Sequence, residues 1–188
     1  RIGRLKQRLN EVRTHRMIQR QKREAVPLPV FSIVGYTNAG KSTLFNALTK
    51  ANAFVEDKLF ATLDPMVRRL KLPSGRHVLL TDTVGFIRKL PHTLVEAFKA
   101  TFEEVAFSDG LIHVVDASDS EVFQHMETVE QVLLELNLNH KPSLTVLNKI
   151  DCGPARLNGR KGIPVSALTG AGLESLIGEI DRLLRTSL

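Results

Sequence analysis

The chain carries, at residues 35–42, the stretch Gly35-Tyr36-Thr37-Asn38-Ala39-Gly40-Lys41-Ser42, which fits the phosphate-binding loop pattern G-x-x-x-x-G-K-[ST]. An apolar run at residues 30–34 predicts a buried strand before this loop, and residues 43–49 predict a helix after it. A strand, a glycine-rich turn and a helix N-terminus form an anion site, because backbone N–H groups and the helix dipole both favour negative charge. Lys41 is expected to reach the β- and γ-phosphates of a nucleotide, and the Ser42 hydroxyl to bind Mg²⁺.

A second segment indicates which base the nucleotide carries. Asn148-Lys149-Ile150-Asp151 follow an apolar run at residues 144–147. The Asp151 carboxylate can accept hydrogen bonds from N1–H and the exocyclic amine of guanine, whereas adenine offers neither group in that arrangement. A buried carboxylate left unpaired is costly, so the segment predicts guanine selection, with Asn148 and Lys149 bracing the base pocket. The alternative is a simple turn after a strand, since Asn and Asp favour turns.

A third segment, Asp82-Thr83-Val84-Gly85, follows an expected strand at residues 77–82. Asp82 is expected to hold a Mg²⁺-bound water. The Gly85 N–H is expected to touch the γ-phosphate and so to sense its loss.

Two further segments, with less specific sequence signals, complete the expected set of nucleotide-binding segments. Thr62, within residues 59–65, lies where a mobile loop must supply a second hydroxyl to Mg²⁺, while backbone around Ala167 is expected to close over the guanine. The expected catalytic residues are Lys41, Thr62 and Gly85, and the expected metal ligands are Ser42, Thr62 and, through water, Asp82. The expected nucleotide-binding residues are Gly35, Tyr36, Thr37, Asn38, Ala39, Gly40, Lys41, Ser42, Thr43, Phe60, Ala61, Thr62, Asp82, Thr83, Val84, Gly85, Asn148, Lys149, Asp151, Ser166, Ala167 and Leu168.

These segments carry a family resemblance. The chain resembles TRAFAC-class GTPase domains and, within that class, the HflX family of ribosome-associated GTPases of the Obg–HflX-like superfamily. The match lies in residues 35–46, 59–65 and 82–92, and the last two runs are more specific than the phosphate loop, which many GTPases share. The resemblance covers residues from about 28 to the C-terminus. It implies Mg²⁺-dependent GTP hydrolysis and action on the large ribosomal subunit, in splitting or rescue of ribosomes or in subunit maturation.

The fold expectation is an α/β, P-loop NTPase three-layer fold, with a mainly parallel six-stranded sheet, one antiparallel strand and helices on both faces. Strands are predicted at residues 30–34, 66–72, 77–82, 111–116, 144–148 and 163–165, and helices at 41–49, 93–104, 121–136 and 172–184. A tight turn at Pro73-Ser74-Gly75 predicts that the second and third strands pair as an antiparallel hairpin.

Length and composition limit the domain organisation of the chain and the environments that suit it. At 188 residues the chain suits one domain with an appendage. No apolar run approaches the ~18 residues of a membrane span, and the single cysteine, Cys152, cannot form an internal disulfide. These features fit a cytoplasmic protein, expected to be a monomer. Residues 1–26 are expected to be a basic helical linker from an N-terminal domain that HflX-like proteins carry, and residues 27–188 to form the GTP-binding (G) domain.

The N-terminal segment carries the excess positive charge. Residues 1–24 hold nine Lys and Arg against two Glu, which gives +7, while the rest of the chain sums to −1. Ile2, Leu5, Leu9 and Val12 recur at helical spacing. We interpret this segment as a helix that contacts ribosomal RNA phosphates, together with the absent N-terminal domain. The alternative is a solvated helix whose charges only keep it soluble.

Two positions bear on the rate of hydrolysis. Phe86 occupies the place where Ras-like proteins carry the glutamine that orients the attacking water, so slow intrinsic hydrolysis is expected. Phe86 is interpreted either as a gate or as an anchor of its segment. His92 lies nearby, but a surface histidine is the simpler interpretation. Asn38 raises the hypothesis of a K⁺ site, because some related GTPases use an asparagine there; the alternative is that Asn38 only tolerates left-handed loop geometry.

Three rivals to ribosome-stimulated hydrolysis stay open. The first is a regulatory GTPase switch that binds a protein partner and hydrolyses little GTP. The second is an RNA-binding module in which GTP only stabilises the fold. An ATP-dependent enzyme is the least favoured, because Asp151 argues against adenine.

Overall fold

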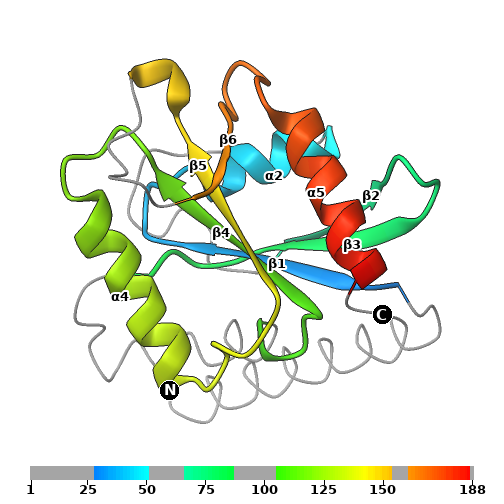
Figure 1. The fold of residues 1–188 in the computed structure, drawn as a ribbon, viewed down its shortest axis with the longest axis horizontal. Helices are drawn as coiled ribbons and strands as arrows, with labels where there is room; N and C mark the ends of the chain where they lie inside the picture. The colour runs from blue at the N-terminus through cyan, green and yellow to red at the C-terminus, as the bar shows by residue number, and fades with distance from the viewer. Residues whose placement is uncertain (1–27, 51–65, 87–104, 154–160, 187–188) are drawn as a thin grey trace, which may run out of the picture.

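The computed structural model describes residues 28–50, 66–86, 105–153 and 161–186. Within these ranges six strands form one sheet in the order β2-β3-β1-β4-β5-β6 (Figure 1). The strands are β1 (Val30–Gly35), β2 (Met66–Lys71), β3 (His77–Asp82), β4 (Gly110–Asp116), β5 (Ser143–Asn148) and β6 (Ile163–Pro164). The helices are α2 (Lys41–Thr49), α4 (Val122–Glu135) and α5 (Leu173–Thr186), with a 3-10 helix η1 (Ile150–Cys152).

The pairing of the strands confirms the predicted sheet. β1 runs parallel to β3 and β4, and β5 runs parallel to β4 and β6. Of the six described strands only β2 is antiparallel, and it pairs with β3 in a register that places Leu70 opposite Val78. The hairpin turn closes where the Gly75 N–H donates to the Leu72 carbonyl at 2.9 Å. Gly75 has a φ of 82°, which suits a residue without a Cβ.

Helices cover both faces of the sheet (Figure 1). On one face Phe45 of α2 and Ile180 of α5 pack with Ile33 of β1 in one buried cluster. On the other face Val129 of α4 packs with Val34 of β1. Because consecutive residues of a strand point to opposite faces, Ile33 and Val34 serve the two layers in turn. The three-layer architecture predicted from the continuous apolar runs is therefore confirmed.

The predicted boundaries differ from the observed ones by one or two residues. β2 and β6 each end one residue early, and α5 begins one residue later than expected and ends two residues later. The helix η1 was not predicted. The expected helix at residues 93–104, the linker at residues 1–26 and the match at residues 59–65 lie outside the described residues. None of the described helices is both long and apolar enough to cross a membrane.

A buried carboxylate joins the β2–β3 turn to α5. Asp181 of α5 accepts hydrogen bonds from the Ser74 hydroxyl at 2.6 Å and from the Ser74 backbone N–H at 3.2 Å. The guanidinium groups of Arg76 and Arg185 each contact it at 3.1 Å. The bonds from Ser74 outweigh the opposing effect of burial and, helped by Arg76 and Arg185, lower the pKa of Asp181 to about 2. We call this cluster the Asp181 clasp.

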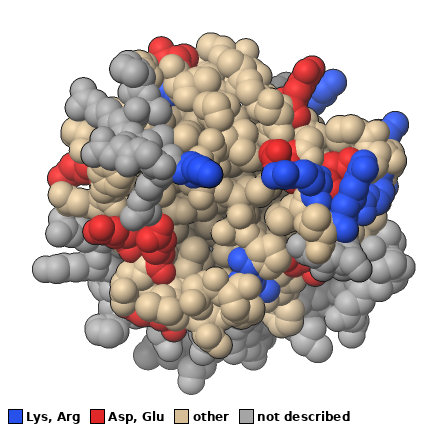
Figure 2. Space-filling model, in the orientation of Figure 1, with Lys and Arg blue, Asp and Glu red and all other residues tan. Residues whose placement is uncertain are grey.

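Charge is unevenly distributed over the described surface. On one side of the molecule, over the β2–β3 hairpin and α5, basic side chains lie together with acidic ones (Figure 2). The basic residues are Arg68, Arg69, Lys71, Arg76, Arg182 and Arg185, and the acidic residues of α5 are Glu174, Glu179 and Asp181. Acidic side chains gather on α4 and the loop before it (Figure 2). They are Asp119, Glu121, Glu127, Glu130 and Glu135.

Candidate nucleotide-binding site

The phosphate loop turns sharply between β1 and α2. Gly35 has a φ of 154° and Gly40 a φ of 89°. A Cβ on Gly35 would collide with the Val114 carbonyl, and one on Gly40 with the Asn148 amide. Both glycines are therefore required by close approach as well as by backbone angle. The loop delivers the chain into the first turn of α2, where backbone N–H groups face an incoming anion.

Lys41 lies at the centre of this loop. Its ammonium is almost fully buried and donates a hydrogen bond to the Tyr36 carbonyl at 2.8 Å. Burial lowers the pKa of Lys41 to about 8, while the nearby Asp82 carboxylate acts in the opposite direction. A phosphate placed in the loop would supply further negative charge and so favour the ammonium form.

Ser42 and Asp82 come together from different elements. The Ser42 hydroxyl, on the first turn of α2, donates to the Asp82 carboxylate at 2.7 Å, and Asp82 is buried at the end of β3. A hydroxyl and a carboxylate are oxygen donors of the kind that Mg²⁺ prefers. The pair therefore fits the expected metal site. Thr62, the other expected ligand, lies outside the described residues, as do Phe60 and Ala61.

Asn148 links the phosphate loop to the loop after β6. Its amide donates to the Ala39 carbonyl at 2.9 Å and accepts from the Ala167 N–H at 3.0 Å. The side chain is buried, so each bond is protected from water. The expected bracing role of Asn148 thus has a physical basis in two backbone contacts.

Asp151 and Ser166 bring the two expected base-binding segments together. A hydrogen bond involving the Ser166 side chain lowers the pKa of Asp151 and favours the carboxylate that guanine needs. Asp151 is exposed, whereas Ser166 is fully buried. The penalty for leaving the carboxylate unpaired, on which the prediction of base selection rests, therefore arises only once a base covers it. Leu168 is 79% exposed beside Ala167, at the rim of this region.

Comparison with known proteins now decides the family. Residues 30–149 match the family described as "50S ribosome-binding GTPase". The chain belongs to this family.

Relatives within the family extend over nearly the whole chain. GTPase HflX of Caldanaerobacter subterraneus subsp. tengcongensis is 53% identical over 98% of the chain, and GTPase HflX of Magnetococcus marinus is 54% identical over 97%. The chain spans 43% and 44% of the lengths of these two relatives. A GTP-binding protein from Sulfolobus solfataricus, solved with GDP, has a TM-score of 0.65 and 30% identity, over 95% of this chain and 59% of that one. The HflX resemblance and the P-loop GTPase fold are both confirmed.

In this GTPase domain, Lys149 has a partner that the sequence analysis missed. Its ammonium lies 2.7 Å from the Asp116 carboxylate at the end of β4. Burial alone would raise the pKa of Asp116, but the hydrogen bonds from Lys149 and Ser118 outweigh it and lower that pKa. Asp116 thus holds the Lys149 stem in place beside the expected base pocket. The signal that could have found it was its position as the last residue of a predicted strand.

The segment after Asp82 lies directly against the phosphate loop of the GTPase. The Thr37 N–H donates to the Phe86 carbonyl at 2.8 Å, and the Phe86 N–H donates to the Gly35 carbonyl at 3.0 Å. A Cβ on Gly85 would come within 2.8 Å of the Thr37 Cα and 3.0 Å of the Lys41 Nζ, so the segment needs glycine here. The Phe86 side chain is buried in the cluster that contains Val34. In this structure Phe86 is an anchor.

The remaining predicted site residues include two whose side chains pack within the fold and two that lie on the phosphate loop and α2. The Thr83 hydroxyl donates to the Ile33 carbonyl, and Val84 is buried in the core, so their side chains hold the sheet together. Asn38 has a φ of 60° in the loop, and Thr43 lies on the first turn of α2. The described site residues follow the carboxyl ends of β1, β3, β5 and β6, the edge at which open α/β sheets bind ligands.

Proposed function

We propose that this chain is the GTP-hydrolysing domain of a ribosome-associated factor that acts on the large ribosomal subunit, in splitting, rescue or maturation. The supporting observation is the convergence at one sheet edge of three parts: the phosphate loop with Lys41, the Ser42–Asp82 pair and the Asn148–Asp151 segment. The proposal places the factor in the cytoplasm as a monomer, with residues 1–26 and an N-terminal domain adding contacts to ribosomal RNA. GTP and GDP are its proposed ligands.

The chemistry is positioning and charge stabilisation. Ser42 and Asp82 would hold Mg²⁺, with Thr62 as a further ligand, and that ion would neutralise charge on the β- and γ-phosphates. Lys41 would donate to the same phosphates from its buried position. The Gly85 N–H would contact the γ-phosphate. The Phe86 phenyl ring cannot orient a water molecule, so the proposal assigns no catalytic base to this chain.

The same contacts give a switch. Thr62 and Gly85 would both engage the γ-phosphate side of the nucleotide, so hydrolysis would release the segments at residues 53–62 and 85–90. The close approach of Gly85 to Thr37 and Lys41 of the phosphate loop supports this proposal. The proposal extends to K⁺ beside the phosphates, held by Asn38.

The test is GTP turnover by the full-length parent, with and without purified large ribosomal subunits. We expect stimulation of about tenfold or more, abolished by Lys41→Ala. Absence of stimulation would reject the ribosomal role while leaving GTP binding in place.

One observation favours the second candidate, a regulatory GTPase switch that binds a protein partner and hydrolyses little GTP on its own. Phe86 is buried where a water-orienting side chain would be needed. In that case turnover would stay slow with ribosomes, and a protein partner would bind the GTP form in preference to the GDP form.

A further inference from the structure

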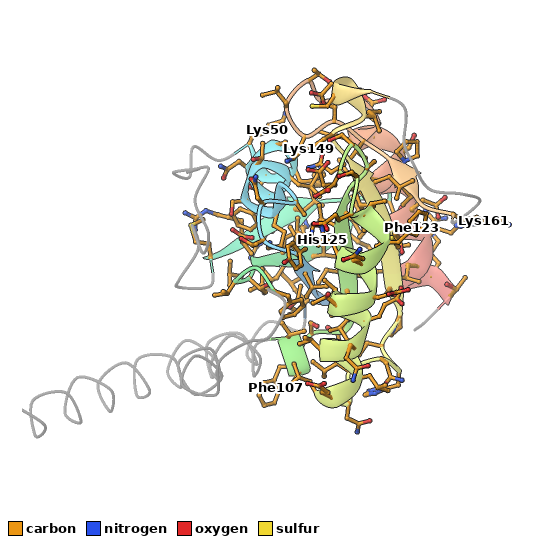
Figure 3. All side chains as sticks on the ribbon, turned by 90° about the vertical axis from the view of Figure 1, so that its left-hand side faces the viewer. Lys50, Phe107, Phe123, His125, Lys149 and Lys161 are labelled. Carbon is orange, nitrogen blue, oxygen red and sulfur yellow. The ribbon has the colours of Figure 1, made fainter. Side chains whose placement is uncertain are left out.

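The phosphate loop is held from outside by an aromatic stack. The Tyr36 ring lies on the His125 imidazole with centroids 3.8 Å apart and planes inclined by 12°. Tyr36 belongs to the phosphate loop, whereas His125 lies on the N-terminal half of α4 (Figure 3). The stack therefore joins the nucleotide edge of the sheet to a helix on one of its faces.

His125 is itself fixed in place. Its Nδ1 lies 3.2 Å from the Asp119 carboxylate, and its Nε2 lies 3.9 Å from the Glu121 carboxylate. Asp119 in turn accepts a hydrogen bond from the Glu121 N–H at 2.8 Å, and the His125 N–H donates to the Glu121 carbonyl at 3.0 Å. The imidazole therefore presents one face to Tyr36 in a set orientation.

Tyr36 occupies the point where the loop's internal contacts meet. Its carbonyl accepts the hydrogen bond from the Lys41 ammonium at 2.8 Å. Its backbone forms the bridge to Phe86, next to the glycine expected at the γ-phosphate. Fixing the Tyr36 ring therefore fixes the carbonyl on which Lys41 rests.

A cavity borders the phosphate loop beside the stack. A cavity of about 50 Å³ lies between the phosphate loop and the β4–α4 side of the molecule. Its lining includes Tyr36, Asn38, His113, Asp116 and His125. Because side chains leave this space open, the Tyr36–His125 stack is a side-chain contact that supports the loop on this flank.

We propose that His125 is a positioning residue for the phosphate loop, which acts through Tyr36 to set the Lys41 ammonium for the phosphates. The inference deepens the proposed GTPase function and rests on it for its kinetic consequences. It assigns to α4 a role in nucleotide binding that is exerted through Tyr36.

The chain offers a direct spectroscopic report of the stack. Tyr36 is its only tyrosine, and it has no tryptophan. The tyrosine band of the near-ultraviolet circular dichroism spectrum therefore reports the order of this ring alone. In the 188-residue chain, His125→Ala should weaken that band while the far-ultraviolet spectrum stays unchanged. His125→Phe, which keeps a flat ring for stacking, should restore it.

The functional readout is nucleotide affinity together with turnover. His125→Ala should weaken GDP affinity and lower kcat/KM for GTP by about threefold to tenfold, as expected for loss of one aromatic pair. His125→Phe should recover most of both values. His140→Ala is the matched control, because His140 is an exposed histidine beyond α4. His140→Ala should leave the tyrosine band, the GDP affinity and kcat/KM for GTP unchanged.

The outcomes separate the inference from the proposed function. An unchanged tyrosine band in His125→Ala would overturn the inference, because the stack would not exist in solution. A weakened band with unchanged GDP affinity would also overturn it, since the stack would then be structural only. GDP affinity needs neither hydrolysis nor ribosomes, so the inference can stand where the ribosomal role fails.

Discussion

Asn148 shows at the level of one residue how the base pocket and the phosphate loop are coupled. Its buried side-chain amide donates a hydrogen bond to the Ala39 carbonyl and accepts one from the Ala167 N–H. We expect Asn148→Ala to lower stability by about 1–3 kcal/mol, because both backbone groups lose their partner. GDP affinity should fall by about tenfold or more, a loss that titration calorimetry measures.

The exposed Asn139, in the loop after α4, supplies the control. Asn139→Ala should leave stability and GDP affinity unaltered. Equal GDP affinity of Asn148→Ala and the unmodified chain would show that the link between the two loops is dispensable.

Asn38 allows the K⁺ hypothesis to be tested without disturbing the loop. Its φ of 60° is a conformation that glycine adopts freely, so Asn38→Gly removes the amide and preserves the backbone. If the amide helps hold K⁺, GTP turnover should be several-fold faster in KCl than in NaCl, and Asn38→Gly should remove the difference. Equal rates in the two salts for the unmodified chain would dismiss K⁺ activation and leave the left-handed geometry as the reason for Asn38.

The elements of this fold are held together by contacts that lie far apart along the chain. The Asp181 clasp joins the β2–β3 turn to α5 across 107 residues. Within the described residues, β2 is an edge strand of the sheet and pairs with β3 alone. The clasp therefore anchors one edge of the sheet to a helix.

The Asp181 clasp should be visible in acid unfolding. The pKa of Asp181 in the folded chain is about 2, below the ordinary aspartate value of 3.8. A depressed pKa means that the carboxylate contributes stability above pH 3.8, which is lost as the pH falls through 2. Asp181→Asn should be less stable than the unmodified chain near neutral pH. The difference in free energy of unfolding between the two should shrink as the pH falls from 3.8 through about 2.

Urea unfolding at stepped pH measures the effect. Glu127→Gln, at an exposed position on α4, serves as the control and should follow the unmodified chain. A gap between Asp181→Asn and the unmodified chain that stays constant from neutral pH down to pH 2 would mean that the Asp181 charge does not stabilise the clasp.

For the molecule as a whole, the sequence was most informative where function or burial imposes a local pattern. The continuous apolar runs of β1, β4 and β5 gave the strands, and the turn at Pro73-Ser74-Gly75 gave the hairpin. The phosphate loop and the Asn148–Asp151 segment were recognisable because nucleotide chemistry requires particular residue types at fixed spacing. The family could be identified for the same reason.

Contacts between distant side chains could not be predicted. Asp116 with Lys149, Asp181 with Ser74 and Tyr36 with His125 each join two elements across many residues. None of these pairs produces a periodic or spaced signal, because each depends on how elements dock. Burial of individual residues was also out of reach, and the exposed position of Asp151 is the clearest example.

Among the described residues, charge is separated between the β2–β3 hairpin and α4. Basic residues are in excess on the β2–β3 hairpin, and acidic residues are in excess on α4 and the loop before it. A molecule of this kind experiences a torque in the field of a large polyanion before any contact forms. The charges of the described residues favour an approach with the β2–β3 hairpin leading and α4 trailing. The orienting range is about 8–10 Å at physiological salt and shrinks as salt is added, so approach should become slower and less directed.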